Sequence, residues 1–415
     1  MGFYLHTDFK IAFVGGLAMP EDRENNKAYS QAGTLFQERL LDSLRNSGIK
    51  VSEIFSLRPV ASYPADRRLF FGTGRFIVLG SFSTKLIPFV NLGPLKTISS
   101  GATLFPPLFC WAWKHRRYRN RAILLYNVSS PPGIVSVIAG RFTGTKVFSV
   151  VADIQVPGSG SLKNTFLRRL DFLLQTRTLG LLNGLITLTE NIAKDFAPQT
   201  PSMLMEGAIP ENLIEEGKAN PYAVPEKRED DKKIVLMYAG GLSELKGIPL
   251  LLEAFALLQD GDYQLWITGK GPMQRLVEQA AKQDPRITYW GFPPYDRVLE
   301  LYQKASILIN PHSTDLLSAR YLFPSKLIEY LATGKPVIST CSTPEVFKEY
   351  GGVVVPLQES TAEALGDKIR YIANMTVAER HAIGTMGRMF VLERKTWKEQ
   401  GARIAKFIQK IVDGS

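Results

Sequence analysis

A lysine at a predicted helix start marks the first place where this chain could hold an anion. Pro324 stops the preceding segment, and the hydroxyl of Ser325 predicts a helix N-cap just before Lys326. The first turn of a helix carries unpaired backbone N–H groups, which attract phosphates. Glu329, one turn along, is a carboxylate that can accept hydrogen bonds from paired ribose hydroxyls. Gly334 suits the left-handed position that ends such a helix.

A second lysine stands in a glycine-rich turn. Residues 238–247 (YAGGLSELKG) predict a strand, a turn through Gly240 and Gly241, and Lys246 at the start of a helix. Glycines let the backbone approach a phosphate closely, and a lysine there acts as a compact point charge. A β-turn with a solvated lysine is the structural alternative.

The segment 323–338 (FPSKLIEYLATGKPVI) resembles the donor-binding motif of family 4 glycosyltransferases, retaining enzymes with the two-domain GT-B fold. In that family, loop amides hold the donor diphosphate and sugar, and the glutamate holds the ribose. The resemblance assigns these roles to Phe323, Pro324, Ser325, Lys326 and Leu327, and to Glu329. An ordinary helix start with a surface Lys and Glu is the alternative.

The glycine-rich turn is similar to the family pattern G-R-L-x-x-x-K-G, in which Arg and Lys clamp the diphosphate. Gly240 and Lys246 match, but Gly241 stands where arginine is common. One guanidinium is therefore missing, and Arg320 or Lys326 is expected to substitute for it.

Two more positions depart from the family pattern. His312 follows Asn-Pro where relatives often have arginine, and a neutral imidazole offers less charge to a phosphate. Tyr321 stands eight positions before Glu329, where many relatives carry a first glutamate linked to the donor sugar. The resemblance therefore leaves the identity of the sugar open and indicates a subgroup of the family.

Two turns resemble the parts of the family that meet the nucleotide. Gly269 lies in Thr268–Pro272 (TGKGP), which is similar to the family's G-x-G-P turn. Phe292 follows Gly291 at the place where the family grips the base. The first turn is also compatible with a plain strand-to-helix connection.

Two places in the N-terminal half could contribute to a site. Residues 10–16 (KIAFVGG) predict a buried strand that ends in a turn at Gly15 and Gly16, without the G-x-G-x-x-G dinucleotide fingerprint. These glycines either admit a ligand or only form a tight turn. Asp153 follows the strand predicted at 146–151, where it could bind or deprotonate an acceptor hydroxyl. Capping the next turn is its alternative role.

The family resemblance also implies a mechanism. Transfer is thought to occur on one face of the sugar, and the leaving diphosphate takes the acceptor's proton, so no protein nucleophile is needed. Lys246 and Lys326 would stabilise the leaving diphosphate. Asp260-Gly261-Asp262 matches a D-x-D metal motif but precedes a predicted strand, so we expect a turn there. We expect no metal and no cofactor besides the nucleotide-sugar substrate.

Composition limits the class of protein. The chain has 415 residues, 45% hydrophobic and 21% charged, which is typical of soluble globular domains. Its two cysteines lie far apart, which fits a reducing compartment. No signal peptide is visible, and the most apolar run, 101–113, is too short to span a bilayer. A cytoplasmic location is expected.

Positive charge is concentrated in the N-terminal half. Between Asp66 and Asp153 there are 12 basic residues and no acidic one. Residues 104–121 (LFPPLFCWAWKHRRYRNR) run from apolar and aromatic residues into a basic cluster, a composition typical of peripheral contact with an anionic membrane. A buried core segment with a solvated basic end is the alternative. We expect no nucleic-acid partner, since no known binding module surrounds the segment.

Together these features predict an α/β protein of GT-B architecture, with two Rossmann-like doubly wound domains facing a cleft. The expected domains are an acceptor-binding domain at 1–220, a nucleotide-sugar-binding domain at 221–395, and a C-terminal helix at 396–415 that crosses back to the first domain. The expected activity is retaining transfer of a sugar from UDP or GDP to a saccharide or a polyprenyl-diphosphate-linked acceptor. A non-catalytic GT-B subunit that stabilises a partner glycosyltransferase is the alternative.

Overall fold

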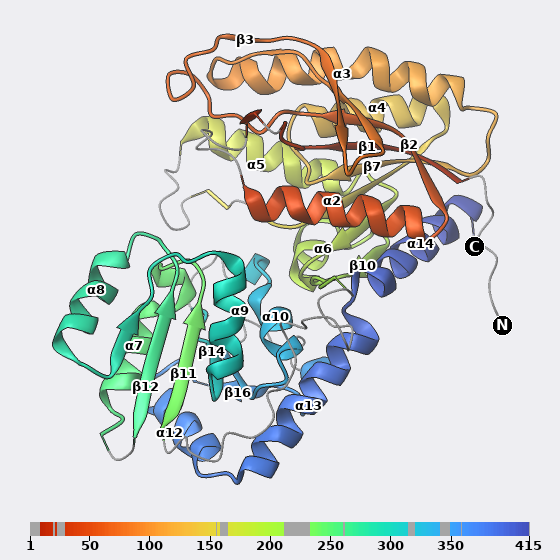
Figure 1. The fold of residues 1–415 in the computed structure, drawn as a ribbon. Coiled ribbons are helices and arrows are strands. Elements are labelled where there is room, and N and C mark those ends of the chain that lie inside the picture. The colour runs from red at the N-terminus through yellow and green to blue at the C-terminus, as the bar shows by residue number, and fades with distance from the viewer. Residues whose placement is uncertain are drawn as a thin grey trace. The chain divides into compact units, whose positions relative to one another are not determined.

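Figure 1 shows the chain as a computed structural model. The structure describes residues 9–19, 21–22, 30–154, 156–157, 165–210, 233–259, 262–313, 320–340, 349–357 and 359–414. The chain divides into an N-terminal unit, Met1–Glu206 with Trp397–Ser415, and a C-terminal unit, Gly207–Thr396. The predicted boundary at residue 220 lies outside the described residues.

The N-terminal unit contains an eight-stranded sheet whose neighbouring strands are parallel except for β4 and β5. The strand order is β10 (Ser202–Leu204), β9 (Gly184–Thr187), β8 (Lys146–Val151), β7 (Arg121–Tyr126), β1 (Phe9–Gly15), β2 (Ile49–Ser56), β5 (Phe82–Leu86) and β4 (Gly74–Val78). The short strands β3 (Phe70–Phe71) and β6 (Phe89–Val90) pair separately. The β4–β5 hairpin extends the doubly wound sheet that the sequence predicts.

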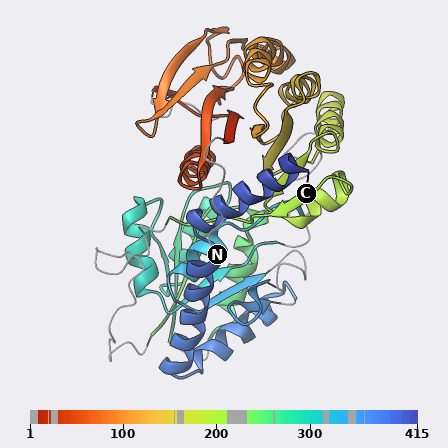
Figure 2. The ribbon, with the colours of Figure 1, turned by 90° about the vertical axis from the view of Figure 1, so that its right-hand side faces the viewer.

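Helices cover both faces of this sheet. The helices are α2 (Gln31–Asn46), α3 (Gly93–Lys114), α4 (Pro132–Thr143), α5 (Phe166–Leu179), α6 (Glu190–Phe196) and α14 (Trp397–Asp413). Figure 2 shows α3, α4 and α5 in a row, coloured from orange to yellow-green, on one side of the strands. The chain crosses from β1 to β2 through α2 and, in the opposite direction along the sheet, from β7 to β8 through α4. Right-handed connections therefore place α2 and α4 on opposite faces.

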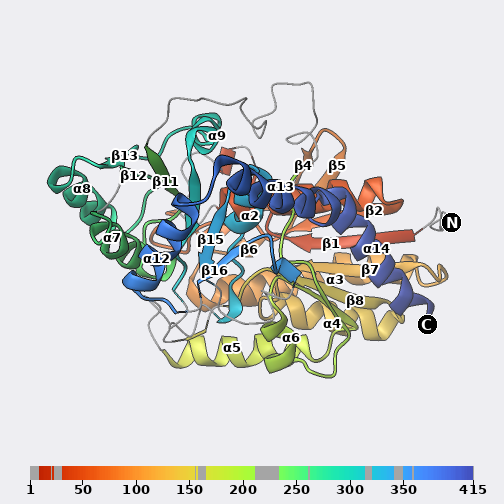
Figure 3. The same ribbon diagram turned by 90° about the horizontal axis from the view of Figure 1, so that it is seen from below.

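The last helix confirms the predicted return of the chain. Helix α14 packs against α2, β7 and β9 of the N-terminal unit (Figure 3). Ile404 and Ile408 are fully buried on its inner face. The two helices approach so closely that a Cβ atom at Gly401 would lie 2.7 Å from the backbone oxygen of Ser43. Only glycine permits this separation.

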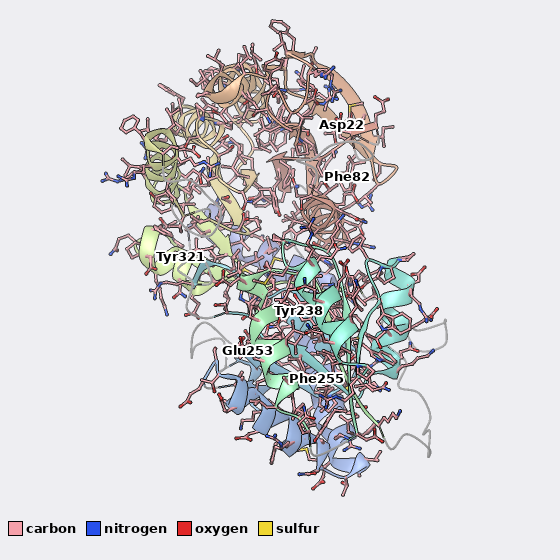
Figure 4. All side chains as sticks on the ribbon, turned by 90° about the vertical axis from the view of Figure 1, so that its left-hand side faces the viewer. Asp22, Phe82, Tyr238, Glu253, Phe255 and Tyr321 are labelled. Carbon is pink, nitrogen blue, oxygen red and sulfur yellow. The ribbon has the colours of Figure 1, made fainter. Side chains whose placement is uncertain are left out.

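The C-terminal unit contains a six-stranded parallel sheet. Its order is β13 (Ile287–Tyr289), β12 (Tyr263–Thr268), β11 (Ile234–Ala239), β14 (Ile307–Asn310), β15 (Val337–Thr340) and β16 (Val355–Leu357). Its helices are α7 (Ile248–Ala256), α8 (Gln274–Gln283), α9 (Tyr295–Lys304), α10 (Lys326–Ala332), α12 (Ala362–Ala373) and α13 (Val377–Arg394). Tyr238 and Phe255, labelled in Figure 4, belong to its core.

Candidate functional site

The strand order of the C-terminal unit places a topological switch point between β11 and β14. From β11 the chain proceeds to β12 and β13 on one side, then returns to β14 on the other. In open α/β sheets, ligands bind outside the carboxyl ends of the strands at such a switch point. Lys246 follows β11 in a 3-10 turn, and His312 follows β14. The sheet therefore brings two predicted donor-binding residues to one place.

Glycines allow the turns at this edge to pack directly against one another. Gly247 has φ +71°, and a Cβ atom there would lie 1.5 Å from the carbonyl oxygen of Pro311. Gly269 has φ +135°, and its Cβ atom would lie 1.7 Å from the carbonyl oxygen of Gly240. The turns that follow β11, β12 and β14 thus form one continuous backbone surface. Gly241 differs, because a Cβ atom there would meet nothing within 4 Å.

Four charged or titratable side chains gather at this surface. Lys246 Nζ lies 3.1 Å from Nε2 of His312. Burial lowers the pKa of Lys246, and the charge of Lys326 lowers it further. Lys326 in turn forms an ion pair with Glu329 Oε2 at 2.8 Å. Two cations held near each other in a partly desolvated place favour an anionic ligand between them.

His312 is neutral at physiological pH. Burial and the neighbouring Lys246 charge lower the pKa of His312 to about 4. Its Nδ1 faces the carbonyl oxygen of Ser313 at 3.3 Å, which requires the proton on Nδ1. Nε2 then accepts from the ammonium of Lys246. Sequence position alone pointed to a replaced arginine, whereas the structure gives His312 a role in orienting Lys246.

One of the two carboxylate oxygens of Glu329 accepts no hydrogen bond from the described residues. Oε1 is buried and has no hydrogen-bond partner among the described residues. The next residue fixes the helix that presents it, because the Tyr330 hydroxyl bonds to the amide (2.8 Å) and the carbonyl (3.1 Å) of Ala239 at the end of β11. A buried acceptor without a donor fits a ligand hydroxyl, the role that the sequence predicts for Glu329.

The loop before α10 differs from its prediction. Ser325 is at the N-cap position, as predicted, but it has helical backbone angles and its side chain makes no cap hydrogen bond. A tight turn replaces it: the amide of Ser325 donates to Phe323 O at 2.9 Å, and that of Leu327 to Pro324 O at 2.8 Å. Phe323, Pro324 and Leu327 are buried, whereas Ser325 is exposed. The backbone of this loop is therefore partly used by its own turn.

The remaining predicted donor residues lie at the rim of the unit. Phe292 is 67% exposed after β13, two strands away from β11, and Lys270 lies 4.5 Å from its ring centre. Arg320 is exposed. Tyr321 is buried, and the carboxylate that many relatives of the family carry at this position is absent because the residue is a tyrosine.

The N-terminal unit has its own switch point, between β1 and β7. Asn127 follows β7 directly and has φ +56°, and its Nδ2 donates to Asp153 Oδ1 at 3.1 Å. Its Oδ1 accepts from the amide of Ala152 at 2.7 Å. Desolvation raises the pKa of the Asp153 carboxyl, and the Asn127 hydrogen bond opposes this rise. Asn127 was not predicted as a site residue, although an asparagine directly after a strand is a signal for a left-handed turn.

The glycine turn after β1 is occupied by a side chain. The amide of Gly16 donates to Gln37 Oε1 at 2.8 Å. A Cβ atom at Gly15 would lie 2.3 Å from the same oxygen. The close approach that these glycines permit is therefore made by Gln37, and the Gly16 amide is engaged in this structure.

Residues 104–121 contain the second half of α3 and the following turn. Leu104, Leu108 and Trp111 are buried, as the core alternative expects, whereas Arg116 and Trp113 are exposed and stacked at 4.3 Å. Two prolines lie inside the helix.

Arg121 does not belong to the exposed basic cluster. It is buried on β7 and donates to Thr145 Oγ1 at 3.0 Å and to Thr143 O at 2.9 Å. Burial lowers the pKa of its guanidinium.

The part of the chain that the structure describes has neither a metal-binding cluster nor a membrane-spanning helix. It contains no group of three or more His, Cys, Asp or Glu side chains that could hold a metal ion. Asp260 and Gly261 lie outside the described residues, and Asp262 precedes β12. Within the described residues, no helix combines the length and apolar character that a bilayer crossing requires.

Comparison with known structures decides the architecture. Sucrose-phosphate synthase from Thermosynechococcus elongatus aligns with a TM-score of 0.65 and 17% identity, covering 98% of this chain and all of that one. Alr3699/HepE from Anabaena, solved in complex with UDP, aligns with a TM-score of 0.64 and 14% identity, covering 97% and 100%. The fold is GT-B. This GT-B protein has the two α/β domains that the sequence predicts.

Sequence comparison adds to the structural likeness. Residues 233–374 of this GT-B protein match the family described as Glycosyl transferases group 1. A putative colanic acid biosynthesis glycosyl transferase, WcaI of Escherichia coli K12, is 28% identical over 181 residues. The match covers 40% of this chain and 42% of that relative, so it spans about two fifths of the relative's length.

Proposed function

We propose that this protein is a metal-independent, retaining hexosyltransferase. It moves a sugar from a UDP- or GDP-sugar to a saccharide or lipid-linked acceptor in surface polysaccharide or glycan biosynthesis. The observation that carries the proposal is the group formed by Lys246, His312, Lys326 and Glu329 at the switch point of the C-terminal sheet. The group 1 glycosyltransferase match covers the same unit.

In this proposal the donor diphosphate lies between the two lysines. Its charge offsets the repulsion that lowers the pKa of Lys246, and the free oxygen of Glu329 accepts from a ribose hydroxyl. As the glycosidic bond to the diphosphate breaks, negative charge on the leaving oxygens increases and the lysines stabilise it. The acceptor hydroxyl bonds to the sugar carbon on the same face, and its proton passes to the leaving diphosphate.

Asp153 is the proposed acceptor-side residue. Desolvation raises the pKa of this carboxyl, and its oxygens would accept a hydrogen bond from the acceptor hydroxyl. The hydrogen bond from Asn127 fixes its orientation. We place the protein in the cytoplasm, with peripheral contact between residues 104–121 and an anionic membrane.

Calorimetric titration with UDP and GDP, followed by hydrolysis of UDP- and GDP-hexoses, tests the proposal. Binding and slow release of a sugar with the donor's own anomeric configuration, observed by NMR before mutarotation, are expected and would establish retention. Unchanged rates in EDTA are expected of a metal-independent enzyme.

The non-catalytic subunit is the second candidate, favoured by Gly241 and Tyr321 at two family positions. Absence of both nucleotide binding and hydrolysis, with stable association to a partner glycosyltransferase, would select it and reject the enzyme.

A further inference from the structure

Helix α5 exposes an apolar face that no described segment covers. The exposed fractions of its outward side chains are 78% for Phe166, 56% for Leu167, 41% for Leu170, 48% for Leu173 and 37% for Leu174. We call these five side chains the α5 surface. Single exposed leucines are common, but a continuous stripe of this size marks an interaction site.

The spacing of the α5 surface follows one side of a helix. Positions 166, 170 and 174 succeed one another every four residues, and 167 and 173 flank them. The opposite side contains Leu179, which is buried, and Phe172, Gln175 and Thr176, which are partly buried. Helix α5 thus has an apolar stripe directed away from its own sheet, the reverse of an ordinary surface helix.

Arginines accompany the apolar stripe. Arg168, Arg169 and Arg177 of α5 are exposed, as is Arg141 of the neighbouring α4, and Asp171 is the one acidic residue of these two helices. Desolvation raises the pKa of Asp171, which also accepts from Gln175 at 2.7 Å. Arginines can keep their charged heads at lipid phosphates while their stems cover apolar surface.

We propose that the α5 surface docks this protein onto an anionic lipid bilayer. An apolar stripe flanked by arginines fits the surface of such a membrane. The apolar side chains enter the acyl boundary, and the guanidinium groups meet the phosphates of the headgroups. A protein partner of ordinary surface composition would not supply the negative charge. This inference concerns residues outside 104–121 and goes beyond the proposed function.

The position of α5 relates membrane docking to the proposed acceptor side of the protein. Helix α5 follows β8 and precedes β9, two neighbouring parallel strands, so it begins at the carboxyl edge of the sheet where Asp153 lies. Phe166 and Leu167, the most exposed members of the surface, are at that end. A membrane at α5 would present a lipid-linked acceptor to the Asp153 edge of the same unit.

Flotation with vesicles tests the proposal on the full chain. Wild type is mixed with vesicles of phosphatidylcholine alone or with 30% phosphatidylglycerol (about one anionic lipid in three). Binding to the anionic vesicles, weaker at high salt, is expected. The double variant Leu170→Gln/Leu174→Gln should lower the partition coefficient at least about tenfold. Arg169→Gln/Arg177→Gln should remove most of the preference for phosphatidylglycerol.

Matched controls separate the α5 surface from other exposed apolar residues. Phe70→Gln/Ile77→Gln changes two side chains that are 75% and 67% exposed on β3 and β4 of the same unit, and should bind like wild type. Circular dichroism melting shows whether each variant is folded. Arg116→Gln/Arg117→Gln/Arg119→Gln tests the 104–121 segment separately.

Three outcomes would overturn the proposal. They are no binding of wild type to anionic vesicles, unchanged binding of the folded α5 variant, and a wild-type oligomer that the α5 variant converts to a monomer without loss of vesicle binding. Nucleotide binding and sugar release are measured without vesicles, so failure of docking leaves the proposed function intact.

Discussion

Lys246 and His312 meet at 3.1 Å although they follow different strands of the C-terminal sheet. The neutral imidazole accepts from the lysine ammonium and therefore holds it without neutralising its charge. A carboxylate at the same place would pair with Lys246 and compete with an anionic ligand. The pair thus keeps a partly desolvated cation available at the switch point.

Replacement of Lys246 tests the role of that cation. Lys246→Met should weaken UDP or GDP binding by about 2 kcal/mol, or about thirtyfold, since a charge-assisted contact is lost. The melting temperature should not fall, because the replaced charge is desolvated and repelled by Lys326. Calorimetric titration measures both nucleotides. Lys282→Met, an exposed lysine of α8, is the control, and an equal loss in that variant would contradict the site.

Gly241 offers a gain-of-function test. A side chain fits there because a Cβ atom meets nothing within 4 Å. Gly241→Arg should tighten binding of the nucleotide diphosphate about tenfold by supplying a guanidinium. Gly241→Gln has a similar length without charge and should bind like wild type. If the two variants bind equally, the diphosphate does not lie beside this turn.

Acid should destabilise the protein through His312. The unfolded-state pKa lies near 6.5 and the folded-state pKa at about 4, so between these values the unfolded chain binds more protons. The free energy of unfolding therefore falls as pH drops from 6.5 to 4, by about 2 kcal/mol at pH 5 from this group alone. Urea unfolding at pH 7.5 and pH 5 should show a smaller loss in His312→Gln than in wild type. The exposed His381→Gln should behave like wild type.

Replacement of Asp153 should lower the rate of sugar transfer without lowering the stability of the fold. Its pKa is raised in the folded state, so its contribution to stability is present at acid pH and is lost as pH rises through the folded pKa. Asp153→Asn removes the ionised form and keeps an oxygen for the Asn127 donor. The variant should melt no lower than wild type at pH 7 and transfer sugar more slowly, with unchanged UDP affinity. Weaker UDP binding would show that Asp153 belongs to the donor side.

Local patterns in the sequence predicted several strands and helices, and the family resemblance predicted the GT-B fold. Apolar runs that end in glycine turns predicted β1, β11 and β12. These features depend on the preferences of neighbouring residues, which the order of amino acids specifies directly.

Only the tertiary structure decided which distant groups meet. It pairs His312 with Lys246, fills the Gly16 turn with Gln37, and buries Arg121, which its sequence neighbours had placed in a basic surface cluster. The apolar stripe of α5 is visible as a periodicity, but periodicity alone does not say whether a helix turns its stripe towards the sheet or towards solvent. The physical reason is the same in each case: local order determines secondary structure, whereas contacts, burial and pKa values depend on how segments far apart in sequence pack together.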